Sequence, residues 1–293
     1  MNDFPELGFV GLGIMGRPMA LNLLRTGYPL HVHARRAESM APLTDAGALG
    51  ADSPQAIARR ADIIFIMVSD TSDVEAVVFG AHGLASAARP GSVVVDMSTI
   101  SPLVTRDMAA RLTGQGVTML DAPVSGGEAG AIEGTLSIMI GGEAGTVARV
   151  MPLLQVLGKN VVHVGESGAG QVAKACNQIT VSGAIAAVAE AMLFARQNGV
   201  DPYKVREALM GGFAGSRILD VHGKRMLDGQ FAPGFKARLH QKDIHIVLET
   251  ARQLGVAVPS SAWFAQLLNA LVGSGDGELD SSAIIKVLER MSR

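Results

Sequence analysis

The sequence predicts an α/β domain over residues 1–165, followed by an all-α domain over residues 166–293. Two observations predict this fold class. Up to about residue 165, short apolar runs rich in β-branched residues alternate with amphipathic stretches, a pattern typical of βαβ units. After Gly170 the strand pattern stops, and the chain becomes rich in Ala and Met, which favour helix.

The expected strands of the first domain are short, and several are apolar at every position instead of alternating. Such strands are buried on both sides, so helices are expected over both faces of the sheet. In chain order, the strands are expected at residues 7–10, 29–33, 63–68, 92–96, 118–120, 137–140 and 161–164.

One long helix, expected over about residues 170–198, connects the two domains and ends near Gly199. Its apolar part at residues 175–189 is too short and too polar to span a bilayer, so it is expected to be buried in the protein. Asp201-Pro202 and Pro259 are start signals for two later helices. The helices after the long one are expected at residues 201–210, 216–228, 240–254, 259–273 and 281–291.

The composition argues against several classes of partner. The chain has 25 Lys and Arg residues against 27 Asp and Glu residues, without the basic excess of a nucleic-acid-binding protein. Cys176 is the single cysteine, and the N-terminal residues lack the pattern of a signal peptide. His240 and His245 diverge on a helix, so no metal site is expected. We therefore expect a cytoplasmic protein with no metal and with no nucleic-acid or membrane partner.

A Gly-x-Gly-x-x-Gly turn stands between the first expected strand and the helix after it. Gly11 permits the tight turn, Gly13 lets backbone N–H groups approach a pyrophosphate, and Gly16 allows close packing of helix on strand. The phosphates would lie at the positive end of the helix dipole. This context predicts a Rossmann-type dinucleotide site in preference to a turn that binds nothing, with the cofactor-binding residues Gly11, Leu12, Gly13, Ile14, Met15 and Gly16.

Arg35 and Arg36 follow the second expected strand, where an NAD-binding protein commonly carries an acid for the ribose 2′-hydroxyl. Guanidinium groups match a 2′-phosphate in charge and in geometry. The sequence therefore predicts NADP(H) as the preferred cofactor, with NAD(H) possible. In the alternative interpretation, the arginines are solvated and Glu38 turns back to the ribose.

Four separated motifs resemble those of the β-hydroxyacid dehydrogenases, a family that includes 3-hydroxyisobutyrate dehydrogenase and tartronate semialdehyde reductase. They span nearly the whole chain, at residues 8–16 (GFVGLGIMG), 121–127 (DAPVSGG), 168–178 (GAGQVAKACNQ) and 242–243 (KD). The resemblance implies reversible oxidation of a small 3-hydroxyacid by a nicotinamide cofactor without a metal. It also implies a Rossmann domain, a helical domain, and assembly into a homodimer or homotetramer.

Within this family, the chain is similar to tartronate semialdehyde reductases at residues 127–128, 134–137, 211–216 and 239–240. This similarity implies reduction of tartronate semialdehyde to glycerate. One alternative is the same chemistry on 3-hydroxyisobutyrate, L-serine or succinic semialdehyde. Another is a non-catalytic dinucleotide-binding module, but such a protein is expected to lose the catalytic lysine, and Lys174 is present.

Lys174 is expected to be the catalytic residue. It lies in the first turns of the long helix, beside Gly170 and small apolar residues, at a position expected to face the cleft between the domains. Its ammonium group can polarise a carbonyl and donate a proton as hydride arrives. The alternative is a surface lysine, the commonest fate of this residue type.

Ser125, Gly126 and Gly127 follow a strand end and a proline. Their backbone N–H groups and the hydroxyl can converge on a substrate carboxylate as an anion nest. Without the resemblance, an ordinary Ser-Gly-Gly turn is an equally good interpretation.

Asn177 and Gln178 lie three and four residues after Lys174, so a helix places at least one of them on the same face as the lysine. Many family members carry Asn four residues after the lysine, where this chain has Gln178, and which amide contacts the substrate stays open. The resemblance also implies cofactor contacts from Val68, Ser69, Thr99 and Lys242, the last of which is also expected to contact the substrate.

Overall fold

The structure is a computed structural model that describes residues 5–292. The chain forms two compact units, and the boundary between them lies between Lys174 and Ala175, inside helix α8 (Ala169–Gln197). The residues up to Lys174 are named the N-terminal unit, and those from Ala175 onward the C-terminal unit. The predicted domain boundary at residues 165–166 precedes α8.

The N-terminal unit is built on one mixed sheet. Within residues 5–292, its strand order is β3-β2-β1-β4-β5-β6-β8-β7, and β9 pairs with β8. The strands from β3 to β6 run parallel, whereas β8 is antiparallel to β6 and β7. The strands are β1 (Leu7–Val10), β2 (Leu30–His33), β3 (Leu49–Gly50), β4 (Ile63–Ile66), β5 (Val93–Asp96), β6 (Thr118–Asp121), β7 (Val124–Ser125), β8 (Leu136–Gly141) and β9 (Gly158–Gly165).

The expected strands are confirmed, with ends that differ by at most a few residues. The sequence did not predict β3 and β7. Each has two residues, which is too short to show the alternation by which a strand is recognised.

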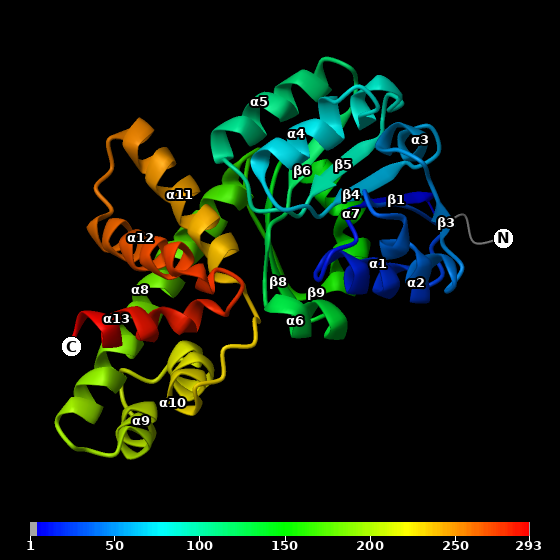
Figure 1. Ribbon diagram of the computed structural model, residues 1–293. Helices are drawn as coiled ribbons and strands as arrows, with labels where there is room; N and C mark the ends of the chain where they lie inside the picture. The colour runs from blue at the N-terminus through cyan, green and yellow to red at the C-terminus, as the bar shows by residue number, and fades with distance from the viewer. Residues whose placement is uncertain (1–4, 293) are drawn as a thin grey trace. The chain divides into compact units, whose positions relative to one another are not determined.

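Helices cover both faces of this sheet, as predicted from the apolar strands (Figure 1). All four residues of β1, β4 and β5 are buried. One face packs against α1 (Gly16–Arg25) and α7 (Ala144–Leu157). The other packs against α3 (Pro54–Ala58), α4 (Thr71–Phe79) and α5 (Pro102–Thr113). The remaining helices of this unit are α2 (Ala41–Thr44) and α6 (Gly127–Glu133).

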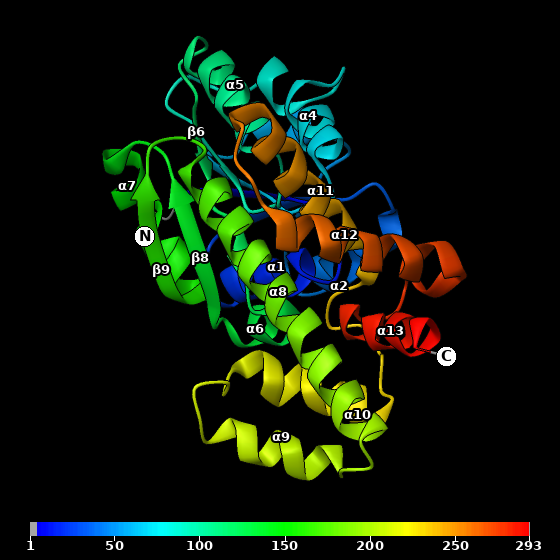
Figure 2. The ribbon, with the colours of Figure 1, turned by 90° about the vertical axis from the view of Figure 1, so that its left-hand side faces the viewer.

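The C-terminal unit is helical, as predicted, and the long helix α8 forms part of its core (Figure 2). By length and composition α8 could cross a membrane, but half of its most apolar window is buried inside the protein. Ile185, Ala189 and Met192 of α8 pack in one cluster with Ile244 and Phe264. The other α-helices are α9 (Pro202–Met210), α10 (Lys224–Asp228), α11 (Ala237–Leu254), α12 (Pro259–Leu271) and α13 (Ile285–Met291), and a π-helical segment, Val272–Asp276, and a 3-10 segment, Ser281–Ile284, lie between α12 and α13.

The predicted start signals of two helices are confirmed. The Asp201 side chain accepts a hydrogen bond from the backbone N–H of Tyr203 and so caps α9. Pro259 occupies the first turn of α12, where its missing N–H costs nothing. The helix expected at residues 216–228 contains a π-helical turn, Leu219–Gly223, just before α10.

Candidate functional site

The predicted cofactor residues of the N-terminal unit lie at one edge of the sheet. The glycine turn follows β1, Arg35 and Arg36 follow β2, Val68 and Ser69 follow β4, and Thr99 follows β5. These four strands are parallel neighbours, so their carboxyl ends meet at the same edge. The order of the strands changes direction between β1 and β4, because β2 and β3 follow on one side of β1 and β5 and β6 follow on the far side of β4. Doubly wound folds bind nucleotides at such a point.

The glycine turn has the shape of a dinucleotide cradle. Gly11 has a φ of 98°, and a Cβ atom there would overlap the carbonyl oxygen of Met67. A Cβ atom at Gly16 would overlap the carbonyl oxygen of Gly11, so this glycine permits the close approach of α1. A Cβ atom at Gly13 would meet nothing within 4 Å. The exposed Gly13 position is therefore open for a ligand, and the three glycines fit the roles expected for a bound pyrophosphate.

Arg35 and Arg36 are both exposed. The Arg35 Nη1 atom lies 3.2 Å from Asp73 Oδ1, and the arginine side chain is 83% exposed. A surface ion pair of this kind contributes at most about 1 kcal/mol, so a phosphate dianion can compete for the guanidinium. Glu38 is also exposed, in a short 3-10 turn, Ala37–Ser39.

Lys174 and the Ser125 loop are brought together within the N-terminal unit. Lys174 is only 7% exposed, so it is not an ordinary surface lysine. Its Nζ atom donates a hydrogen bond of 2.8 Å to the backbone carbonyl of Val124, the residue before Ser125. The ammonium group is thus directed at the loop that the sequence assigns to the substrate carboxylate.

The loop itself depends on two glycines. Gly126 and Gly127 have φ values of 140° and 64°, a region that side-chain-bearing residues rarely adopt. A Cβ atom at Gly126 would come within 3.0 Å of Leu136 Cδ2. Ser125 is partly exposed, and β7 pairs it with Ser137 of β8. The sheet therefore fixes one end of the loop while its glycines turn the backbone.

A buried carboxylate from β6 holds the start of α8. Asp121 Oδ1 accepts a hydrogen bond of 2.7 Å from the N–H of Gly168, and Oδ2 accepts one of 2.8 Å from the N–H of Gln171. The first turn of α8 has no acid of its own, so Asp121 supplies the negative charge that a helix start favours. Burial raises the pKa of this carboxyl, although the two backbone N–H groups oppose the shift.

Gln171 connects the same turn of α8 to the loop after β5. Its Nε2 donates to the carbonyl of Ser98 at 2.8 Å, and its Oε1 accepts from the N–H of Ile100 at 3.1 Å. These two residues flank Thr99, so Gln171 fixes the backbone of an expected cofactor contact. The sequence analysis assigned no role to Asp121 or Gln171, although they lie in the motifs at residues 121–127 and 168–178. A helix start without its own acid was the signal that could have identified Asp121.

The C-terminal unit contains a connected polar chain. The Asn177 Nδ2 atom donates to Gln178 Oε1 at 2.7 Å, and Gln178 Nε2 donates to Asp243 Oδ2 at 2.7 Å. The Nζ atom of Lys242 lies 2.9 Å from Asp243 Oδ1. The structure therefore joins three predicted site residues through Asp243, to which sequence reasoning gave no role.

His240 and His245 of α11 have different surroundings. His240 is fully buried and bonded to Ser182 Oγ at 3.0 Å, whereas His245 is exposed. Over residues 5–292, no group of three or more His, Cys, Asp or Glu side chains has the arrangement to hold a metal ion.

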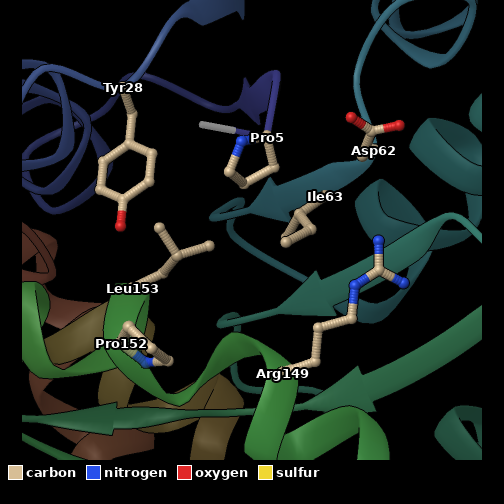
Figure 3. Close-up of a pocket in the computed structure, with 7 residues that line it drawn as sticks. All are labelled: Pro5, Tyr28, Asp62, Ile63, Arg149, Pro152 and Leu153. Carbon is tan, nitrogen blue, oxygen red and sulfur yellow. The ribbon is translucent and has the colours of Figure 1, made fainter. Parts of the chain in front are cut away.

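A cavity of about 480 Å³ lies at the amino ends of the strands, whereas the glycine turn lies at their carboxyl ends. Figure 3 shows the residues that line this cavity. Asp62 and Ile63 are at the amino end of β4, and Tyr28 precedes β2. Arg149, which faces the same cavity, donates to the carbonyl of Gly91 at 2.9 Å. None of the predicted site residues lines this cavity, so it is separate from the chemistry described above.

Comparison with known proteins supports the resemblance of the motifs. Residues 6–165 match the family described as the NAD binding domain of 6-phosphogluconate dehydrogenase. Residues 168–288 match the family described as NAD-binding of NADP-dependent 3-hydroxyisobutyrate dehydrogenase. These two matches account for nearly all of the chain.

Individual proteins resemble the chain over its full length. It is 49% identical to 2-hydroxy-3-oxopropionate reductase of Escherichia coli (strain K12), over 98% of each chain. The 3-hydroxyisobutyrate dehydrogenase of Mycobacterium tuberculosis, solved with L-serine, has a TM-score of 0.89 at 29% identity, covering 97% of this chain and 99% of that chain. Psf3, solved with NADP+ and 2-OPP, has a TM-score of 0.87 at 28% identity, covering 96% and 99%. The chain therefore belongs to the 3-hydroxyisobutyrate dehydrogenase-like family of NAD(P)-dependent oxidoreductases.

Proposed function

We propose that the protein reduces tartronate semialdehyde, or 2-hydroxy-3-oxopropionate, to glycerate in a reversible reaction that uses NADPH in preference to NADH. The observation that carries this proposal is the hydrogen bond from Lys174 to the Val124 carbonyl, which directs a buried ammonium group at the Ser125 loop. The relative with 49% identity bears the name of the same activity.

Lys174 acts as the general acid. When bound, the reduced nicotinamide supplies the hydride. As the carbonyl π bond breaks, the ammonium group of Lys174 donates a proton to the oxygen that would otherwise become an alkoxide. One C–H bond and one O–H bond form, the aldehyde is reduced to an alcohol, and the neutral amine regains its proton from water. In the reverse direction the amine is the base.

The Ser125 loop binds the substrate carboxylate. The left-handed backbone at Gly126 and Gly127 lets successive N–H groups converge, and the Ser125 hydroxyl adds a further donor. Binding the carboxylate here orients the aldehyde toward Lys174, because both groups belong to one short substrate. Lys242 contacts the cofactor or the substrate.

The preference for NADPH comes from Arg35 and Arg36. Both guanidinium groups lie at the carboxyl end of β2, where the 2′-position of the adenine ribose is recognised in this fold. A 2′-phosphate would receive charge-assisted hydrogen bonds that NADH cannot form.

The proposal is tested by measuring kcat/KM for tartronate, succinic and methylmalonate semialdehydes, each with NADH and with NADPH. We expect tartronate semialdehyde to be preferred by at least about tenfold over both competitors, because a site that pairs its hydroxyl discriminates strongly against analogues without one. With tartronate semialdehyde, NADPH is expected to exceed NADH by at least about tenfold.

Other outcomes select other functions. Equal or faster reduction of methylmalonate or succinic semialdehyde, or faster oxidation of L-serine than of glycerate, would remove the proposed substrate and leave the family unchanged. Absence of turnover with all of these compounds, in protein that still binds NADPH, would favour a non-catalytic dinucleotide-binding module.

A further inference from the structure

We propose that Gln171 is a positioning residue that fixes the loop carrying Thr99 against the turn of α8 carrying Lys174, so that the bound nicotinamide and the ammonium group keep the geometry that the reaction needs. This inference rests on the proposed function, in which Lys174 supplies the proton, and on the cofactor contact expected of Thr99. It follows from two side-chain hydrogen bonds of Gln171 and from the contacts that anchor the same turn of α8.

The Gln171 amide makes two hydrogen bonds whose directions are determined by their partners. Its Nε2 atom faces the Ser98 carbonyl, which only accepts, and its Oε1 atom faces the Ile100 N–H, which only donates. All three residues are at most 1% exposed, so water cannot easily replace either bond. Thr99, between the two partners, is partly exposed. Gln171 therefore holds the backbone on both sides of a residue that a ligand can reach.

The loop that Gln171 holds is also bonded to the loop after β4. Ser98 Oγ accepts a hydrogen bond of 3.0 Å from the N–H of Val68, another expected cofactor contact. The Ser98 N–H donates to Asp96 Oδ1, at the end of β5, at 3.0 Å. Ser98 thus connects the carboxyl ends of two neighbouring strands, and Gln171 connects both of them to α8. A displacement of Gln171 would reach two of the expected cofactor contacts.

The backbone of Gln171 is anchored beside Lys174. The Gln171 N–H donates to Asp121 Oδ2 at 2.8 Å, Lys174 Nζ donates to the Val124 carbonyl at 2.8 Å, and each contact spans 50 residues of the chain. The segment from Asp121 to Val124 therefore follows the first turn of α8, with one contact at each end. Gly170 permits this approach, because a Cβ atom there would lie 2.7 Å from the Asp121 carbonyl oxygen.

These contacts place Gln171 between the two groups that react with the substrate. Both ends of its amide bond to buried backbone groups, so Gln171 acts through the loop and the helix turn and not by binding the cofactor itself. A reaction requires its atoms in near-attack geometry, and a displacement of about 1 Å can cost about 10²-fold in rate. Loss of the amide is therefore expected to slow the chemical step and to leave the binding of NADPH nearly unchanged.

The test is a single turnover of the full-length enzyme, preloaded with NADPH and mixed with saturating tartronate semialdehyde. The rate constant for loss of NADPH absorbance reports the chemical step in each complex, whereas the amplitude reports the fraction of enzyme that is folded and active. Gln171→Met keeps the length of the side chain and removes both hydrogen bonds. Its rate constant is expected to fall at least about tenfold, and its Kd for NADPH to change by less than about threefold.

Asp121→Asn tests the anchor of the same turn. The substitution keeps the shape of the side chain but places an NH₂ group against a backbone N–H, so its rate constant is expected to lie between those of wild type and Gln171→Met.

Two control variants separate positioning from stability. Gln155→Met removes a glutamine amide at an exposed position of α7 and is expected to behave as wild type. Leu112→Ala leaves a cavity beneath α5, where Leu112 is fully buried. It is expected to lower the melting temperature and the amplitude while keeping the wild-type rate constant.

A wild-type rate constant in Gln171→Met, or an equal fall of the rate constant in Leu112→Ala, would overturn this inference and leave Lys174 as the proposed proton donor. If the wild-type enzyme did not reduce tartronate semialdehyde, the proposed function would fall, and single turnovers with the semialdehyde that it does reduce would decide the role of Gln171. If it reduced no semialdehyde, both would fall.

Discussion

At the scale of single residues, Lys174 combines burial with a defined hydrogen bond to the Val124 carbonyl. Truncation of Lys174 to alanine removes the proposed proton donor but no group proposed to bind the dinucleotide. We expect Lys174→Ala to lower kcat by about 10²–10⁴-fold, the usual contribution of general acid catalysis, and to leave the Kd for NADPH nearly unchanged. Steady-state rates and a fluorescence titration with NADPH measure the two quantities.

Lys159→Ala, at an exposed position of β9, is the matched control for loss of a lysine and is expected to keep full activity. If Lys174→Ala retained more than about a third of the wild-type kcat, the lysine would not be the general acid.

Arg35 and Arg36 are exposed, so their replacement is expected to affect the cofactor and not the stability of the fold. Replacing both by Ala removes the proposed charge-assisted hydrogen bonds to a 2′-phosphate, which would be worth about 1.5–3 kcal/mol each. We expect kcat/KM with NADPH to fall at least about tenfold and kcat/KM with NADH to change little. Cofactor saturation curves for wild type and variant test this expectation.

Arg59→Ala combined with Arg60→Ala changes the net charge equally at another exposed arginine pair of the same unit. If kcat/KM with NADPH fell equally in that control, the effect would be due to overall charge. A wild-type enzyme that preferred NADH would contradict the role given to Arg35 and Arg36.

At the scale of elements, the turn from β1 to α1 separates the effects of two glycines. Gly16→Ala would force a Cβ atom into the carbonyl of Gly11, so we expect the free energy of unfolding to fall by about 1–3 kcal/mol. Gly13→Ala meets no protein atom within 4 Å, so stability is expected to change by less than about 0.5 kcal/mol. Its added methyl group would occupy the position proposed for the pyrophosphate, and KM is expected to rise at least about tenfold for both NADH and NADPH.

Thermal unfolding and cofactor kinetics on the two glycine variants distinguish these effects. A Gly13→Ala variant that bound both cofactors normally would show that the exposed glycine is not part of the cofactor cradle. Early unfolding of this variant would instead show that the Gly13 position is not open in the folded protein.

The short strand β7 shows the limit of sequence periodicity. The strand Val124–Ser125 precedes the loop proposed to bind the substrate carboxylate, and its Val124 carbonyl accepts the Lys174 hydrogen bond, yet its two residues give no alternation to recognise. It exists because β8 pairs with it, and that partner lies more than ten residues later in the chain. The sequence predicts a role for this loop from its motif, which stays a prediction, and it missed the secondary structure of the loop.

At the scale of the whole molecule, one buried carboxylate of the C-terminal unit connects several segments. Asp280 accepts hydrogen bonds from the N–H groups of Gly234, Phe235 and Ser282, and pairs with Arg225 at 2.7 Å. Burial alone would raise the pKa of Asp280, but the contact of His222 Nδ1 with its carboxylate at 3.4 Å and the hydrogen bonds from Ser282 and Phe235 outweigh burial and hold the pKa well below its usual range.

This shift predicts how stability depends on pH. In the unfolded chain an aspartate titrates at about pH 4, so as the pH falls the unfolded chain binds the proton before the folded protein does. The stabilisation by Asp280 is therefore complete above about pH 4 and is lost as the pH falls through the pKa of the folded protein. We expect Asp280→Asn to be less stable than wild type by about 1–3 kcal/mol at neutral pH. Between about pH 5 and pH 3 its melting temperature is expected to fall less than that of wild type.

Melting temperatures of wild type, Asp280→Asn and the exposed control Asp107→Asn over this pH range test the expectation. Parallel melting curves for wild type and Asp280→Asn would show that the buried carboxylate does not contribute to acid denaturation.

The sequence by itself determined the two fold classes, most strands and helices, the glycine turn and the family. Each of these depends on residues that are neighbours in the chain: the period of apolar residues, the capping signals at Asp201 and Pro259, and the spacing of glycines. Local patterns of this kind are visible without knowing which distant segments meet.

Only the tertiary structure decided which polar groups act on one another. Asp121 reaches the start of α8 across 47 residues, Lys174 reaches Val124 across 50, and Gln178 reaches Asp243 across 65. A side chain's donors and acceptors are known from its type, but the orientation of an amide is determined by the partner that faces it. For this reason the sequence left the choice between Asn177 and Gln178 open, whereas in the structure the carboxylate of Asp243 in α11 determines the orientation of the Gln178 amide.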